Sequence, residues 1–174
     1  MLTLLKIVVA IAALTVAVYA WGGFLPREHT ASRRMDLKAS PDAVWARVAN
    51  EADAPQWRKD VKAATRLPDR NGHEVWREDF TSGNALAYET LEQTPPSRLV
   101  RQIVDEEMFG GTWTITVAPS ATGTTITITE NGWVENPLFR IVAKHIMGHD
   151  GTINTYLGHL AASFGEEAAI APAM

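Results

Sequence analysis

The sequence feature that most constrains the fold is a long amphipathic stretch at residues 136–164. Asn136 is a good helix N-cap, and Pro137 suits the first helical position because its missing N–H leaves no hydrogen bond unmade. Gly165 stands where helices commonly end. Apolar side chains recur between these ends at helical spacing: Leu138, Ile141, Val142, Ile146, Ile153, Tyr156, Leu157, Leu160 and Phe164. We expect one helix of about 42 Å, at about 1.5 Å per residue, which is long enough to cross a small domain.

The chain before this helix reads as strands with one short helical segment. Ser40, Pro41 and Asp42 supply a cap, a first-turn proline and a first-turn acid for that segment. Strands are expected at residues 33–39, 61–67, 73–80, 85–92, 99–105, 112–117 and 124–130. A run of strands before one amphipathic helix predicts an α+β fold, in which a curved antiparallel sheet is wrapped around a long C-terminal helix.

A bent sheet that wraps one helix leaves space between the two, and an aromatic-lined pocket is expected there. Trp76, Trp113 and Trp133 are candidates for its wall, and the alternative is that they are ordinary core residues. Three glycines interrupt the last helix. They either allow close approach to the sheet or permit a kink near Gly148, and the sequence does not decide between these alternatives.

The amino terminus is apolar and predicts a membrane anchor. Residues 7–25 carry no charge and reach the length of a membrane span. Tyr19, Trp21 and Phe24 lie where interfacial aromatic residues are expected. The alternative is a cleaved signal peptide with its site near residues 18–20. We expect a retained single-pass anchor because the apolar run continues beyond that site.

Basic residues flank this segment on both sides, at Lys6 and at Arg27, Arg33 and Arg34. The side of the membrane that the domain faces is therefore undetermined. The expected organisation is an anchor or uncleaved signal at residues 1–25, a linker at 26–32, a ligand-binding domain at 33–166 and a tail at 167–174.

Charge and cysteine content exclude some classes of function. Lys6 is the only charged residue among the first 24, so the remainder carries 15 basic and 20 acidic residues. An acidic domain without a basic run is a poor nucleic-acid binder. The chain has no cysteine, which excludes disulfides and thiolate metal sites. The sequence also lacks G-x-S-x-G and P-loop motifs.

Glu130 is the most informative polar residue, because strand alternation with Ile126 and Ile128 turns its side chain inward. An inward carboxylate needs a partner. The candidate partners are Arg77, Arg101, His145 and His149. Glu130 then acts either as part of a structural salt bridge at the cavity mouth or as a ligand-orienting or acid–base group.

His145 and His149 stand four residues apart, a spacing that can bring two imidazoles to one metal ion. No third ligand is evident beyond Asp150, so neither a metal site nor a cofactor is predicted. The candidate ligand-binding residues are Trp76, Arg101, Trp113, Glu130, Trp133, His145 and His149. No catalytic residue is assigned, although Glu130, His145 and His149 are candidates.

Several short motifs occur in a characteristic order: Ser-Pro-Asp-Ala-Val-Trp at 40–45, Pro-Gln-Trp at 55–57, Gly-Thr-Trp-Thr at 111–114, and Thr-Ile-Thr-Glu at 127–130 before Asn-Pro-Leu-Phe-Arg at 136–140. Over residues 33–165 the chain resembles the START-like superfamily of helix-grip proteins, in particular the polyketide cyclase/dehydrase-like SRPBCC proteins. The resemblance implies a hydrophobic or amphipathic ligand held between sheet and helix.

The superfamily includes binders, transporters and enzymes, so the resemblance leaves function open. The first hypothesis is a membrane-anchored binding protein for a lipid, isoprenoid or aromatic molecule. The second is a cyclase/dehydrase-type enzyme that uses Glu130 with His145 or His149 as acid and base. The third is a membrane-tethered interaction module. The oligomeric state is not predicted.

Overall fold

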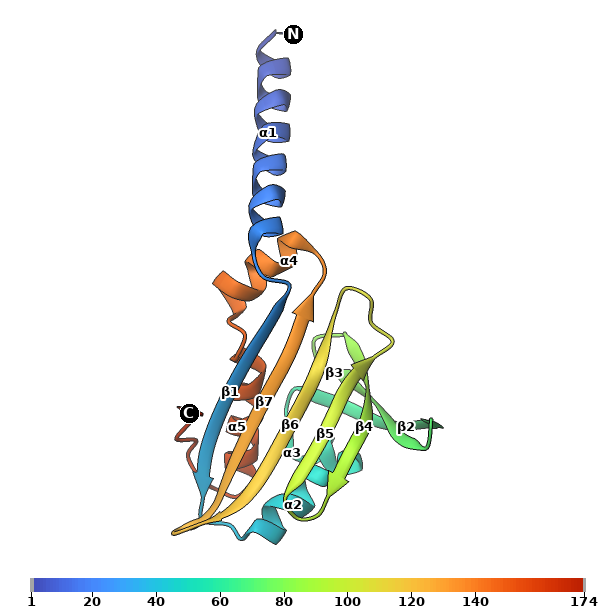
Figure 1. Ribbon diagram of the computed structural model, residues 1–174, viewed down its shortest axis with the longest axis vertical. Helices are drawn as coiled ribbons and strands as arrows, with labels where there is room; N and C mark the ends of the chain where they lie inside the picture. The colour runs from blue at the N-terminus through green and yellow to red at the C-terminus, as the bar shows by residue number, and fades with distance from the viewer. Residues whose placement is uncertain (1, 174) are drawn as a thin grey trace.

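The computed structural model describes residues 2–173 and contains one antiparallel sheet of order β2-β3-β4-β5-β6-β7-β1-β8, with helices on its concave face (Figure 1). The strands are β1 (Glu28–Leu37), β2 (Val61–Arg70), β3 (His73–Phe80), β4 (Ala85–Thr94), β5 (Arg98–Val104), β6 (Phe109–Ser120), β7 (Gly123–Val134) and β8 (Ala171–Pro172). The helical elements are α1 (Leu2–Phe24), α2 (Pro41–Ala49), η1 (Glu51–Asp53), α3 (Ala54–Trp57), α4 (Pro137–Val142), the π-helical η2 (Ala143–Met147) and α5 (Gly151–Ser163). The helix-grip fold class is confirmed.

Every strand expected from the sequence is present, but the first begins earlier than expected. β1 begins at Glu28 and pairs with β7 over its whole length, from Glu28 opposite Trp133 to Leu37 opposite Thr124. Most of residues 26–32, expected as a linker, therefore belongs to the sheet. Residues 28–32 lack apolar alternation, and it is pairing with β7 that makes them a strand.

The expected tail at residues 167–174 also contributes to the sheet, since β8 pairs with β1 at Arg33 and Arg34. Met1, at the start of the expected anchor, and Met174, at the end of the expected tail, lie outside the described residues.

The last helix is not continuous, so the expectation of one helix over residues 136–164 is wrong. Asn136 caps α4 as expected, and its side-chain oxygen accepts the Leu138 N–H at 2.8 Å. The chain then passes into η2 and reaches Gly148, which has φ +71° and ψ 143°. This backbone conformation is nearly exclusive to glycine and ends the helix. The kink near Gly148, which the sequence left open, is therefore a complete break.

α5 packs on the concave face of the sheet and fills the space there. Ile153, Leu157 and Leu160 are fully buried. They face the alternating strand positions that the sequence predicted to point inward, among them Ile126 and Ile128. The core has these members: Ala31, Met35, Leu37, Val44, Trp45, Val48, Trp57, Leu99, Ile115, Val117, Ile126, Ile128, Ile153, Tyr156, Leu157, Leu160 and Ala161. The centre of the domain is consequently a packed core.

The apolar helix expected at the amino terminus is present as α1, which extends away from the domain (Figure 1). Its 22 residues Thr3–Phe24 have a mean hydropathy of 2.2 in their most apolar window, and that window is not buried against the domain. By length and composition this helix can cross a membrane, a property that an amino-terminal signal sequence shares. The carboxyl end of α1 contacts α4.

The break at Gly148 generates the first prediction. Gly148→Ala should lower the free energy of unfolding by roughly 1–3 kcal/mol, because alanine is strained at this φ and ψ. The matched control is Gly158→Ala within α5, where a Cβ would meet no atom within 4 Å. That control should raise stability by roughly 0.5–1 kcal/mol. Chemical denaturation in detergent micelles measures both, and equal midpoints for the two variants would contradict the strained conformation.

Candidate functional site

A cleft of about 160 Å³ lies where the last helix breaks, between the ends of β1 and β7 and the segment formed by α4 and η2. Its walls comprise Leu25, Pro26, Arg27, Glu28, His29, Val134, Arg140, Lys144 and His149. A second hollow of about 430 Å³ adjoins it at Glu28 and His29 and extends along β1 and β7 to Trp133. Both lie at the end of the sheet that is nearest to α1.

Glu130 lies beside this cleft with its carboxylate between two ring N–H groups. Oε2 accepts a hydrogen bond from Trp113 Nε1 at 2.8 Å, and Oε1 lies 3.2 Å from His29 Nε2. The His29 ring stacks on His149 with 4.0 Å between ring centroids. The structure therefore places Glu130 on the inward face, with Trp113 and His29 as partners, and brings His149 close through His29.

The remaining partners expected for Glu130 lie elsewhere. Arg77 is exposed and pairs with Asp79, while Arg101 pairs with Glu51. His145 is exposed on η2 and stacks on Trp21 of α1, with 5.5 Å between the ring centroids. The four-residue spacing of His145 and His149 does not place them together, because the helix ends before Gly148.

The other two tryptophans proposed for the pocket wall are separated from the cluster of Trp113, Glu130, His29 and His149. Trp133 is three positions from Glu130 on β7, so strand alternation places it on the opposite face, where the Arg27 guanidinium lies 5.2 Å from its ring centroid. Trp76 on β3 lies under the Arg66 guanidinium, 5.8 Å from the ring centroid. Their side chains therefore do not form one wall.

His149 is held neutral in this setting. Loss of hydration lowers its pKa, and the nearby His29 lowers it further against the opposing charge of Glu130. Asp150, the next residue, pairs with Arg33 of β1. The cleft thus has a neutral imidazole close to a carboxylate, which are the components of general acid–base chemistry. Among residues 2–173, no group of three or more His, Asp or Glu side chains is arranged to hold a metal ion.

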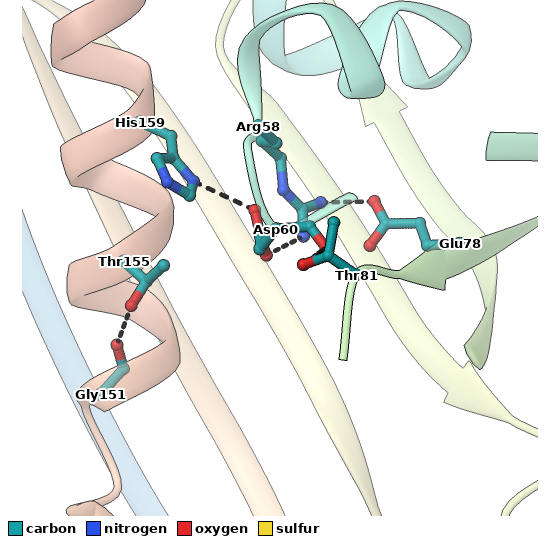
Figure 2. A network of polar contacts seen from close by, with 7 residues as sticks. All are labelled: Arg58, Asp60, Glu78, Thr81, Gly151, Thr155 and His159. Carbon is teal, nitrogen blue, oxygen red and sulfur yellow. Dashed lines mark hydrogen bonds and ion pairs between the residues drawn. The ribbon is translucent and has the colours of Figure 1, made fainter. Parts of the chain in front are cut away.

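A second polar cluster, the buried charge network, lies between the sheet and helices α3 and α5. Arg58 pairs with Glu78 and, at 3.1 Å, with Asp60, whose other oxygen lies 3.0 Å from His159 Nδ1 of α5 (Figure 2). Glu78 is 1% exposed. The charged pair Arg101–Glu51 completes the network, and Glu51 is 5% exposed.

The two buried carboxyl groups of the network have pKa values that are shifted in opposite directions. Burial raises the pKa of Glu78 to about 9, assisted by its hydrogen bond to Glu51 and by the charge of Glu51. Burial alone would also raise the pKa of Glu51, but the charge of Arg101 and the hydrogen bond from Glu78 lower it. At neutral pH, burial therefore favours a protonated Glu78 beside an ionised Glu51.

Tyr156 of α5 connects the two polar clusters. Its ring meets Trp57 and Trp113 edge-on, with centroids 5.2 Å and 5.7 Å away. The Arg58 guanidinium lies 5.2 Å from the same ring centroid. Because Trp113 donates to Glu130, a chain of contacts leads from the cleft to the buried charge network.

Sequence reasoning did not identify His29 or the network members Glu51, Arg58 and Glu78. For Glu78 a signal existed, since it alternates with Trp76 and Phe80 on β3 and so shares their face. Glu51 lies in the short turn η1, where no periodicity reveals which side chains are buried.

The family model described as polyketide cyclase / dehydrase and lipid transport matches residues 28–162. The chain belongs to this family. No curated protein matches the sequence. Membership of the polyketide cyclase/dehydrase and lipid transport family indicates either binding of hydrophobic ligands or cyclase/dehydrase-type chemistry.

Solved structures agree with this family fold. The ginseng major latex-like protein 151 from Panax ginseng has a TM-score of 0.63 at 10% identity, covering 80% of this chain and 96% of its own. A START superfamily protein from Mycobacterium smegmatis has a TM-score of 0.56 at 16% identity, covering 78% and 99%. The di-domain ARO/CYC StfQ of the steffimycin biosynthetic pathway has a TM-score of 0.59 at 9% identity, covering 81% and 53%. At these identities the likeness concerns the fold alone.

The raised pKa of Glu78 predicts how stability depends on pH. Both carboxyls are ionised in the unfolded chain above about pH 5, whereas the folded chain keeps one proton up to about pH 9. Unfolding therefore releases a proton, and the free energy of unfolding should fall by about 1 kcal/mol per pH unit between pH 7 and pH 9.

Glu78→Gln should remove most of this fall, because the amide does not ionise at any of these pH values. The control Glu92→Gln alters an exposed carboxylate that pairs with Arg98 at 3.0 Å and should keep the parent's dependence. Denaturation midpoints at pH 7, 8 and 9 measure the effect. A fall in Glu78→Gln as steep as in the parent would show that the pair does not hold the proton.

Proposed function

We propose that this protein binds a hydrophobic or amphipathic small molecule, such as a lipid, an isoprenoid or an aromatic compound, in the cleft beside η2, and that α1 anchors it in a membrane. The observation that carries the proposal is the position of the cleft. Leu25 and Pro26, which line it, follow directly after the apolar helix. A molecule dissolved in the membrane would therefore meet this opening first.

The charges of the cleft favour a ligand with an acidic group. Arg27 pairs with Glu135 at 2.7 Å, and Arg140 donates to the backbone carbonyls of Leu25, Val134 and Glu135. Lys144 has no ion-pair or hydrogen-bond partner among the described residues. It is therefore the cation available to a carboxylate or phosphate group of the ligand.

The packed centre of the domain limits where the apolar part of a ligand can lie. Core residues fill the space under α5, so the apolar part of a ligand would contact the apolar lining of the cleft itself, which consists of Leu25, Pro26 and Val134. A packed core is also what we would expect if the protein were a membrane-tethered interaction module. Ligand binding is favoured over it by the family and by the lining of the cleft.

The test uses the full-length protein in detergent micelles. Native mass spectrometry reports a co-purifying small molecule, and displacement of a fluorescent fatty acid reports binding. Lys144→Ala should weaken binding of that acidic probe roughly tenfold, the effect of one charge-assisted hydrogen bond, and leave binding of its uncharged methyl ester unchanged. Lys62→Ala, an exposed lysine on β2, is the matched control. Absence of both a co-purifying molecule and probe binding would refute the binding proposal and favour the interaction module.

A cyclase/dehydrase-type enzyme is the second candidate, and the contact among Glu130, His29 and His149 favours it. His149 remains a candidate from the sequence, whereas His145 lies against Trp21. Glu130→Gln keeps an acceptor for the Trp113 N–H and removes the proton-transferring carboxylate. Turnover of the co-purifying molecule should then fall roughly 10²–10⁴-fold if the protein is an enzyme. A binding protein should show no turnover and only a small change in affinity.

A further inference from the structure

Large apolar side chains are exposed at the end of the domain from which α1 emerges. We call this group the collar, and its members are Phe24, Met108, Phe109, Leu138, Phe139 and Ile146. Phe24 is 87% exposed, Ile146 76% and Phe139 57%. The collar residues lie on α1, on α4, on η2, in the connection from β5 to β6 and at the start of β6, all at the same end of the sheet (Figure 1). A patch of this kind marks an interaction surface.

The collar is fixed to the end of α1 by close contacts. A Cβ on Gly22 would come within 2.2 Å of the Pro137 carbonyl oxygen, so only glycine allows α1 and α4 to approach this closely. Trp21 stacks on His145, and Arg140 Nη1 donates to the Leu25 carbonyl at 3.3 Å. Where α1 leaves the membrane, α4 and η2 are therefore at the membrane surface.

We propose that the collar inserts into the lipid bilayer and turns the cleft toward lipid. This inference rests on the proposed membrane anchoring by α1. Charges near the collar have both signs: Glu106 and Glu107 precede Met108 in the β5–β6 connection, and Arg140 and Lys144 lie on α4 and η2. Burial of apolar area, and not attraction to acidic lipid, therefore drives insertion, so it should occur in zwitterionic vesicles. An amphiphile then passes from bilayer to cleft without crossing water.

The test exploits the absence of cysteine from the chain. Single cysteines carrying an environment-sensitive fluorophore replace Phe139 or Ile146 in the collar, Leu14 in α1, and Thr122 in the β6–β7 turn at the opposite end of the sheet. The full chain is reconstituted in phosphatidylcholine vesicles with nitroxide-labelled lipids. Labels at positions 139, 146 and 14 should be quenched by the nitroxides at least about twofold more than the label at position 122.

Each other result overturns the proposal and shows which part failed. If the label at Leu14 is unquenched, both the anchor and the collar are wrong. If Leu14 is quenched while positions 139 and 146 are as accessible to aqueous quenchers as position 122, the collar alone is wrong. If positions 139 and 146 are shielded from water but not quenched by lipid, another protein or a second copy covers the collar.

Measuring ligand transfer from vesicles and ligand binding in detergent distinguishes the role of the collar from that of the binding site. The double variant Phe139→Glu/Ile146→Glu should slow transfer of the fluorescent fatty acid from vesicles to the protein about tenfold or more, because the collar no longer enters the bilayer. Equilibrium binding of the same probe in detergent should stay unchanged. Unchanged transfer would overturn the collar proposal, whereas absent binding by the parent in detergent would refute the proposed function.

Discussion

The backbone conformation at Gly148 determines how the C-terminal helical segment, residues 136–164, is used. A single helix over residues 136–164 would be one rod with one apolar face. The positive φ divides it, so α5 packs into the core while α4 and η2 turn toward α1. The cleft has Lys144 before the break and His149 after it in its lining, and His149 stacks there on His29. On the other side of the break, α4 contacts the apolar helix.

The buried charge network obeys a simple balance of charge. With Glu78 protonated, the carboxylates of Glu51 and Asp60 match the guanidinium groups of Arg58 and Arg101. Ionisation of Glu78 would leave an uncompensated negative charge in a medium that hydrates it poorly, which explains the raised pKa of this carboxyl. A neutral Glu78 therefore leaves the network with balanced charges.

Sequence patterns predicted those parts of the structure that depend on local periodicity. The alternation in β6 and β7 gave the inward face, including Glu130, and Asn136 marked the start of α4. The extent of β1 depends on pairing with β7, which is distant in the sequence, and the partners of Glu130 depend on which loops and strand ends meet there. Helical spacing at residues 136–164 continued through Gly148 because periodicity does not report φ.

The pairing of β8 with β1 affects how the edge of the sheet can interact with other copies of the protein. β8 covers β1 only at Arg33 and Arg34, and Ala173 N donates to the Ser32 carbonyl at 3.3 Å. This short segment covers part of β1, which would otherwise be the edge strand of the sheet and a template for strand addition from a neighbouring molecule. Under the proposed anchoring by α1, copies of the protein would share one plane and meet often, and β8 would then block part of this edge against intermolecular β-pairing.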